Sequence, residues 1–317
     1  MSQWTTNDIP DLRGKVALVT GGNSGLGRET VQALAARGAH VILAARNPER
    51  GEKAREEILQ SVPDASIKFM QLDLASQAAI REFAASFLEA HQRLDLLFNN
   101  AGVMAIPRRE TRDGFEMQFG TNHLGHFALT GLLLPLLLAT PKSRIVTTSS
   151  MARAMGRVNL ADLQGQKGYT RWSAYGQSKR ANLLFAFELQ RRLAATGTET
   201  ISVAAHPGYA HTNLQSTSAT LSNSNLELWF YEKFGAFVGQ PAAMGALPQL
   251  YAGLSPNIHG GELVGPGGFS GMRGHPRVET KAQREYDHPT AERLWDASVE
   301  LTGVDYAQLK QSQSTSV

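Results

Sequence analysis

Apolar, β-branched runs alternate with segments of helical period over the first two thirds of the chain. The runs predict strands at residues 15–20, 41–45, 67–71, 94–98, 144–149 and 201–205. Between them, amphipathic spacing predicts helices at residues 25–37, 48–61, 76–91, 115–139 and 173–195. Strand and helix alternating this often are typical of parallel strands joined by right-handed crossovers. The pattern therefore predicts an α/β protein with a doubly wound parallel sheet and helices on both faces.

The alternation weakens after Pro207. An aromatic-rich stretch over residues 226–237 precedes a predicted helix at 241–251, a short strand at 262–264 and a last helix at 290–301. No linker or low-complexity segment divides the chain, so we expect a single domain. Its expected parts are an N-terminal arm at 1–13, a cofactor-binding and catalytic core at 14–207, a substrate lid with closing elements at 208–310, and a loose tail at 311–317.

Composition narrows the classes of function. The chain has 317 residues, a formal net charge of +3 and no cysteine. This length can bury a sizeable core without disulfides, and the lack of cysteine excludes thiolate metal sites and a cysteine nucleophile. Basic residues are dispersed among acidic ones, so no nucleic-acid partner is indicated. His123, His126, His206 and His211 have no carboxylate at ligand spacing, so no metal site is expected.

The sequence carries no signal for a membrane anchor. Its first residues lack a positively charged region followed by an apolar run. The most apolar stretch, residues 132–138, is far shorter than the ~20 residues needed to cross a bilayer and contains a proline. We therefore expect that stretch to be a buried helix and the protein to be cytoplasmic.

A glycine-rich turn joins the first predicted strand to the first predicted helix. Residues 20–27 read TGGNSGLG. Glycines let the backbone approach a pyrophosphate, and the free N–H groups and positive dipole end of the helix bind its charge. A turn of this kind can also be only a tight connection, but the strand-to-helix context favours a dinucleotide site. The residues expected to bind the cofactor here are Gly21, Asn23, Ser24, Gly25, Leu26 and Gly27.

Arg46 follows the second predicted strand, where an NAD-binding site usually has an acidic residue. A planar guanidinium group pairs well with phosphate oxygens, so an arginine at this position suits a 2′-phosphate. The alternative is an arginine that is merely solvated on a loop. The sequence thus favours NADP(H) as the cofactor, with NAD(H) as the second choice.

Tyr175 and Lys179 lie four residues apart at the start of a predicted helix, so they share one of its faces. A phenol with an ordinary pKa of about 10 is a poor base at neutral pH. An adjacent ammonium group favours the phenolate and would lower that pKa. Such a pair on its own is more often structural than catalytic.

Other polar residues are expected near this pair. Ser149 and Ser150 end the fifth predicted strand, at the sheet edge where open α/β sheets bind ligands, and a serine hydroxyl could hydrogen-bond a reacting oxygen. Residues 99–102 end the fourth strand at the same edge, and their small side chains suit close approach of a cofactor. Asn122 falls in the preceding helix and could hold a water that links Lys179 to solvent.

In this order the motifs resemble those of the short-chain dehydrogenases/reductases, over roughly residues 14–212. The resemblance implies a Rossmann fold and a catalytic tetrad of Asn122, Ser150, Tyr175 and Lys179. Ser150 is chosen over Ser149 because the family usually uses the second serine of such a pair. The resemblance also implies that Lys179 holds the nicotinamide ribose and that Asp73 and Leu74 lie by the adenine. The further expected cofactor contacts are Asn100, Ala101, Gly102, Tyr175, Pro207, Gly208 and Thr212.

Residues 159–163 and 175–187 look like those of the branch that holds retinol-dehydrogenase-like and protochlorophyllide-reductase-like enzymes. The lack of cysteine and of an anchor argues against a light-driven protochlorophyllide reductase. We therefore expect hydride transfer between NADP(H) and a bulky apolar aldehyde, ketone or alcohol, with Tyr175 as general acid and base and residues 226–237 as a substrate lid. The alternative is a non-catalytic, NADP(H)-sensing regulator on the same fold. Pairing into a homo-oligomer through the two long helices is compatible with the resemblance.

Overall fold

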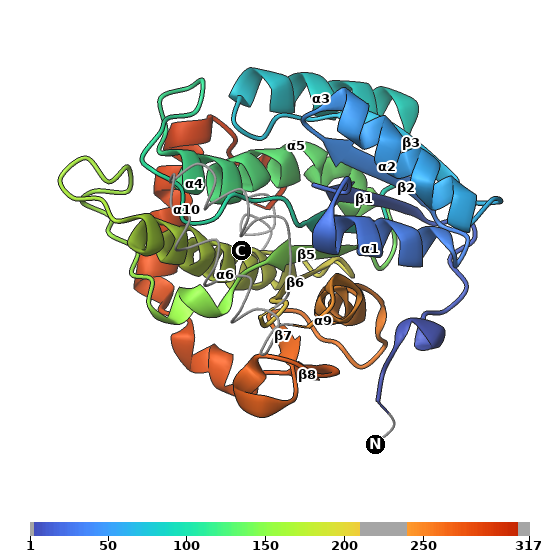
Figure 1. Ribbon diagram of the computed structural model, residues 1–317. Helices are drawn as coiled ribbons and strands as arrows, with labels where there is room; N and C mark the ends of the chain where they lie inside the picture. Colours follow the sequence, from blue (N-terminus) through green and yellow to red (C-terminus); the bar gives the residue numbers. More distant parts are fainter. Residues whose placement is uncertain (1–2, 210–239, 310–317) are drawn as a thin grey trace, which may run out of the picture.

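A twisted sheet forms the centre of the protein (Figure 1), which is a computed structural model that describes residues 3–209 and 240–309. The strand order is β3-β2-β1-β4-β5-β6-β7-β8. The strands are β1 (Val16–Thr20), β2 (His40–Ala45), β3 (Ser66–Gln71), β4 (Leu96–Asn99), β5 (Arg144–Thr148), β6 (Ile201–Ala205), β7 (Leu263–Pro266) and β8 (Pro276–Val278). All pairings from β3 to β7 are parallel, and β8 pairs antiparallel with β7. The predicted doubly wound α/β fold is confirmed.

Helices cover both faces of this sheet (Figure 1). They are α1 (Gly25–Ala35), α2 (Pro48–Ser61), α3 (Gln77–Ala90), α4 (Met117–Phe119), α5 (Gly125–Ala139), α6 (Arg171–Ala194), α9 (Ala242–Leu254) and α10 (His288–Thr302). On one face, α3, α5, α6 and α10 pack on side chains such as Leu18 and Ile42. On the other, α1, α2 and α9 pack on Val19 and Leu43. Because successive strand residues point to opposite faces, the central strands β1, β2 and β4 are apolar on both sides, which is why the sequence predicts them.

The helix predicted over residues 115–139 is three segments rather than one. Between α4 and α5 lies a π-helical turn, Gly120–Leu124, in which the N–H of Gly125 bonds the carbonyl of Gly120. The spacing of apolar residues in the sequence gives no sign of this wider turn. Residues 117–139 are long and apolar enough to cross a membrane, but 72% of their most apolar window is buried in the domain, as in the core helix of a soluble protein.

One strand was not predicted, and two predicted segments lie outside the described residues. Strand β8 was not predicted, because it has only three residues and none of them is fully buried. The predicted lid over residues 226–237 and the tail at 311–317 lie outside the described residues.

An aromatic cluster fixes α5 against α6 and α10. The ring of Phe127 lies 5.4 Å from that of Phe185, 5.1 Å from Trp295 and 4.8 Å from Tyr306, measured between centroids. Phe127 is fully buried, and the hydroxyl of Tyr306 donates to its carbonyl at 2.7 Å. The position of α5 behind the sheet edge depends on this contact.

Phe127→Ala should lower the free energy of unfolding by about 3–5 kcal/mol, because it removes buried area and leaves a cavity that rigid neighbours cannot fill. Urea unfolding measures this directly. Leu88→Ala, at a side chain 36% exposed, serves as the control and should change stability by less than about 0.5 kcal/mol. Equal effects of the two substitutions would contradict the proposed importance of the cluster.

Candidate active site

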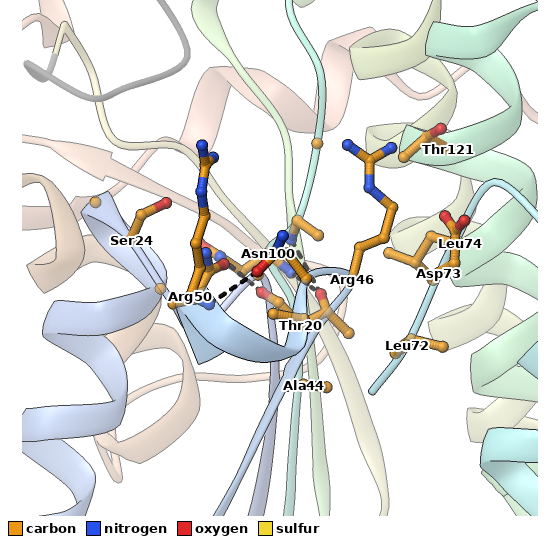
Figure 2. Close-up of a pocket in the computed structure, with 18 of the residues that line it drawn as sticks. Thr20, Ser24, Ala44, Arg46, Arg50, Leu72, Asp73, Leu74, Asn100 and Thr121 are labelled. Carbon is orange, nitrogen blue, oxygen red and sulfur yellow. Dashed lines mark hydrogen bonds between the residues drawn. The ribbon is translucent and has the colours of Figure 1, made fainter. Parts of the chain in front are cut away.

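A cavity of about 670 Å³ opens at the carboxyl ends of β1, β2 and β4 (Figure 2). It lies where the strand order reverses, between β1 and β4, which is where open α/β sheets bind ligands. Many of the residues predicted to bind a cofactor line it: Gly21, Asn23, Ser24, Gly25, Leu26, Gly27, Arg46, Asp73, Leu74, Asn100, Ala101 and Gly102. The structure thus brings together turns that lie far apart in the sequence.

The glycine turn is possible only without side chains. Gly21 has φ +67° and Gly25 has φ +51°, in the left-handed region. A Cβ on Gly27 would lie 2.2 Å from the carbonyl oxygen of Gly21 and 2.6 Å from Nδ2 of Asn100. That Nδ2 donates to the carbonyl of Thr20 at 2.8 Å, so Asn100 ties the turn to the end of β4.

The N-terminus of α1 is left open to the cavity. Ser24 precedes the helix in an extended conformation and makes no side-chain capping bond. By contrast, Asn47, Ser76 and Thr170 each accept a backbone N–H at the starts of α2, α3 and α6. Uncapped N–H groups at the positive end of a helix are the donors that a pyrophosphate needs.

Two guanidinium groups, those of Arg46 and Arg50, line the cavity. Arg46 follows β2 and Arg50 is in the first turn of α2, and both side chains extend in the same direction (Figure 2). Lys53 also lines the cavity. None of the three forms an ion pair with a residue in the described ranges. Of these three cavity-lining residues, only Arg46 was predicted from the sequence. Arg50 and Lys53 were not, although their spacing of three places them on one face of α2.

Tyr175 and Lys179 are buried on α6, beside the end of β5. Tyr175 is 6% exposed and Lys179 is 4% exposed. The ammonium group of Lys179 donates to the carbonyl of Thr148 at 3.0 Å and lies 5.9 Å from the ring centroid of Tyr175. Burial lowers the pKa of Lys179 to about 8.

The expectation that Lys179 lowers the pKa of Tyr175 is wrong for this geometry. Burial has the largest effect and raises that pKa, while a hydrogen bond with Ser150 acts in the opposite direction. The ammonium group is instead directed at a backbone carbonyl. Tyr175 is therefore a protonated phenol at neutral pH.

The two serines at the end of β5 have different partners. The hydroxyl of Ser149 donates to the carbonyl of Lys179 at 2.7 Å and is fully buried. The hydroxyl oxygen of Ser150 accepts the N–H of Ala152 at 3.2 Å, and its hydrogen bond reaches Tyr175. These contacts favour Ser150 over Ser149 as the serine that faces a reacting oxygen.

Asn122 joins the loop after β4 to α6 from within the π-helical turn. Its Oδ1 accepts from the N–H of Val103 at 2.8 Å, and its Nδ2 donates to the Val103 carbonyl and to the hydroxyl of Ser178, both at 2.9 Å. A side chain at position 102 would press on Asn122, since a Cβ on Gly102 would lie 3.0 Å from Oδ1 of Asn122. The same Cβ would lie 3.5 Å from Nζ of Lys179. The water site predicted at Asn122 stays a prediction.

Pro207 and Gly208 form a turn at the end of β6. Gly208 has φ +67°, and its N–H donates to Nδ1 of His206 at 3.1 Å. The carbonyl of Pro207 accepts from Nε2 of Gln240 at 2.9 Å. Thr212 lies outside the described residues.

The chain matches the model of a known protein family. The profile of the short chain dehydrogenases matches residues 15–221. The chain belongs to the short-chain dehydrogenase/reductase family. It is thus an oxidoreductase of a family that acts on alcohols and carbonyls with a nicotinamide cofactor.

Individual members of the family cover nearly the whole chain. Retinol dehydrogenase 11 of Mus musculus is 42% identical over 92% of this chain and 88% of its own length. Retinol dehydrogenase 13 of Homo sapiens is 39% identical over 95% of this chain and 88% of its own. The crystal structure of an uncharacterized protein from Mycobacterium paratuberculosis superposes with a TM-score of 0.79 at 40% identity, over 96% of this chain and 99% of that one. The predicted retinol-dehydrogenase-like branch is confirmed.

The residues present fit a nicotinamide dinucleotide. The open N-terminus of α1 and the side-chain-free turn at residues 21–27 suit the pyrophosphate. Asp73, whose Oδ1 accepts the N–H of Ala75 at 3.1 Å, lines the cavity beside Leu74. No cluster of three histidine, aspartate or glutamate side chains that could hold a metal ion occurs within residues 3–209 and 240–309.

Lys179→Met should stabilise the fold at pH 7 by roughly 1–3 kcal/mol, because it removes a buried charge while Thr148 keeps its bond from Asn182 Nδ2 at 3.0 Å. The pKa of Lys179 is lowered from 10.5 to about 8, so the folded protein binds fewer protons than the unfolded chain between those values. Stability of the unmutated protein then rises with pH across that window, and the advantage of the variant shrinks.

Urea unfolding at pH 7 and pH 10 tests this expectation. Lys281→Met, at an exposed lysine, is the control and should show no such change with pH. A Lys179→Met protein that is less stable than the unmutated one at pH 7 would refute the argument.

Proposed function

We propose that this protein is an NADP(H)-dependent enzyme that interconverts a bulky apolar alcohol and its aldehyde or ketone. The observation that carries the proposal is the buried Tyr175, which has a hydrogen bond with Ser150 and lies one helical turn from Lys179. The ammonium group of Lys179 lies near Gly102, which lines the cavity. A phenol, a hydroxyl donor and a cation meeting in a dry site are the groups that carbonyl chemistry requires.

When bound, the nicotinamide ring supplies or takes up the hydride. Tyr175 donates its proton to the carbonyl oxygen during reduction and takes a proton back during oxidation. Ser150 donates a hydrogen bond to the same oxygen and holds it against the phenol. Lys179, largely an ammonium ion at pH 7, would hold the nicotinamide ribose, which is the other role that the family resemblance gives it. Because burial raises the pKa of Tyr175, the resting phenol carries its proton at neutral pH and can donate it to a carbonyl oxygen.

The proposed substrate is a retinoid or an aldehyde of similar bulk and apolarity. Relatives about 40% identical over most of this chain carry the name retinol dehydrogenase. Two large apolar side chains in nearby segments face solvent. Trp172, whose ring centroid lies 6.0 Å from that of Tyr175, is 41% exposed, and Met155, which follows the turn after Ser150, is 71% exposed. Comparing retinal with a short hydrophilic aldehyde tests the proposal, and faster turnover of the hydrophilic one would overturn it.

The cofactor preference is tested at Arg46. Arg46→Asp removes a charge-assisted contact to a 2′-phosphate, worth roughly 1.5–3 kcal/mol, and places an acid where ribose hydroxyls can bind it. Binding of NADPH, measured by calorimetry, should weaken about 10- to 100-fold while binding of NADH is kept or improved. Equal affinity of the unmutated protein for the two cofactors would contradict the preference.

The chemistry is tested by Tyr175→Phe, which keeps the ring and removes the proton. Turnover should fall about 10²- to 10⁴-fold while NADPH still binds, because only acid–base catalysis is lost. Tyr169→Phe is the matched control, since that hydroxyl donates to the carbonyl of Ile106 at 2.8 Å and lies outside the tetrad. Near-normal turnover in Tyr175→Phe would remove the mechanism. A protein that binds NADPH but turns over no carbonyl would instead be the regulator considered above.

A further inference from the structure

A network of buried and half-buried ionisable side chains lies on the β6–β8 side of the candidate site. Nη2 of Arg153 is 2.7 Å from Oε2 of Glu279 and 3.4 Å from Oε1 of Glu285. Arg180 reaches the other oxygen of Glu285 at 2.7 Å, and Nε2 of His206 lies 2.5 Å from Oε1 of Glu279. These five side chains are called the Arg153 network below.

Three members of the Arg153 network lie next to segments of the candidate site in the sequence. Arg153 is in the turn after Ser150, and its Nη1 donates to the Ser150 carbonyl at 3.2 Å. Arg180 follows Lys179 on α6. His206 precedes the Pro207–Gly208 turn at the end of β6. The two glutamates come from the chain after β8, so a distant segment connects the three.

Hydrogen-bond roles around His206 have only one consistent assignment. The N–H of Gly208 can only donate, so Nδ1 of His206 must be unprotonated. The hydrogen of the neutral ring is then on Nε2 and is donated to Glu279. The Gly208 N–H thus fixes the tautomer, and Glu279 accepts the hydrogen that this tautomer carries on Nε2.

Tyr209 and Gln240, which flank residues 210–239, are hydrogen-bonded next to the Gly208 turn. The N–H of Tyr209 donates to the carbonyl of Met272 at 2.8 Å, and the N–H of Gln240 donates to the carbonyl of Tyr209 at 3.0 Å. A Cβ on Gly208 would lie 2.3 Å from the Met272 carbonyl oxygen, so the turn has little freedom. Tyr209 and Gln240 thus meet next to a turn that His206 holds by a hydrogen bond.

Glu279 has the central position. Burial raises its pKa, but the contacts with His206 and Arg153 outweigh burial, so the pKa lies below its ordinary value and the group is a carboxylate at neutral pH. The side chain of Arg153 is only 8% exposed, and its Nε has no partner among the described residues. Without Glu279, Nε2 of His206 would lose its acceptor, and Nη2 of Arg153 would keep only the longer contact with Glu285, at 3.4 Å.

We infer that Glu279 and Arg153 are positioning residues of the proposed reaction: they hold the Ser150 backbone and the Gly208 turn in the arrangement that Tyr175 needs. Neither side chain is assigned a contact with the reacting oxygen. The inference rests on the proposed function, because it concerns the geometry of that same site. It adds a part of the chain, after β8, to the machinery of the site.

Glu279→Gln tests this in the full-length protein. It keeps the shape of the side chain and can still accept from His206, but it sets an amide against Arg153. We expect kcat to fall about tenfold or more, because a small displacement of a reacting group costs that much, while the Kd for NADPH stays within about threefold. Glu279→Asp, which keeps the charge, should recover part of the lost kcat.

Glu188→Gln is the matched control. Glu188 is a carboxylate 1% exposed that pairs with Arg191 at 2.7 Å and Arg192 at 2.6 Å, about 20 Å along α6 from Tyr175. It should lose stability without losing kcat. A fall in kcat smaller than about tenfold in Glu279→Gln, or an equal fall in Glu188→Gln, overturns the inference.

A second measurement does not depend on turnover. In the ¹⁵N spectrum of histidine-labelled protein, His206 should show an unprotonated Nδ1 and a protonated Nε2. Glu279→Gln should keep this tautomer but shift the Nε2 signal, because an amide oxygen is a weaker acceptor than a carboxylate. If Glu279→Gln does not fold, Arg153→Lys is measured by the same two readouts. The opposite tautomer in the unmutated protein overturns the inference. Turnover that survives Tyr175→Phe would instead refute the proposed function, and the spectrum separates the two failures.

Discussion

The burial of one cation, the ammonium group of Lys179, constrains the rest of the site. It lies at the end of β5 and donates to the carbonyl of Thr148, and burial lowers its pKa to about 8. Gly102 lies close by: a Cβ there would be in ordinary contact with the ammonium nitrogen, at 3.5 Å, and would press on Oδ1 of Asn122, at 3.0 Å. A group that weakens the fold is retained where a reacting oxygen would develop charge, as expected when a site gives up stability for function.

The fold could be predicted from the sequence because its central strands, such as β1, β2 and β4, are buried on both faces and form nearly continuous apolar runs. Two features left no such signal. The π-helical turn at Gly120–Leu124 shifts hydrogen bonds by one residue without changing composition, and β8 has three residues at an edge. Both depend on contacts made only after the chain has folded.

The candidate site could be predicted as an ordered set of motifs, but its electrostatics could not. The helical spacing correctly places Lys179 near Tyr175, yet burial, which no spacing reveals, controls the pKa of both groups. The choice between Ser149 and Ser150 depends on which hydroxyl is already bound to the Lys179 carbonyl. Glu279 lies 126 positions after Arg153, so no local pattern connects them.

The cofactor end and the catalytic end are joined by a buried histidine. Nδ1 of His126 lies 2.9 Å from the carbonyl of Asn122 and must donate to it, which leaves Nε2, 2.9 Å from the hydroxyl of Thr20, as the acceptor in the neutral ring. The Thr20 oxygen already accepts the N–H groups of Asn100 and Ala101, at 2.9 and 3.0 Å. A second proton on His126 would compete for that crowded oxygen, and burial lowers the histidine pKa to about 4. The ring therefore stays neutral, and the π-helical turn that holds Asn122 is hydrogen-bonded through it to the strand that leads into the glycine turn.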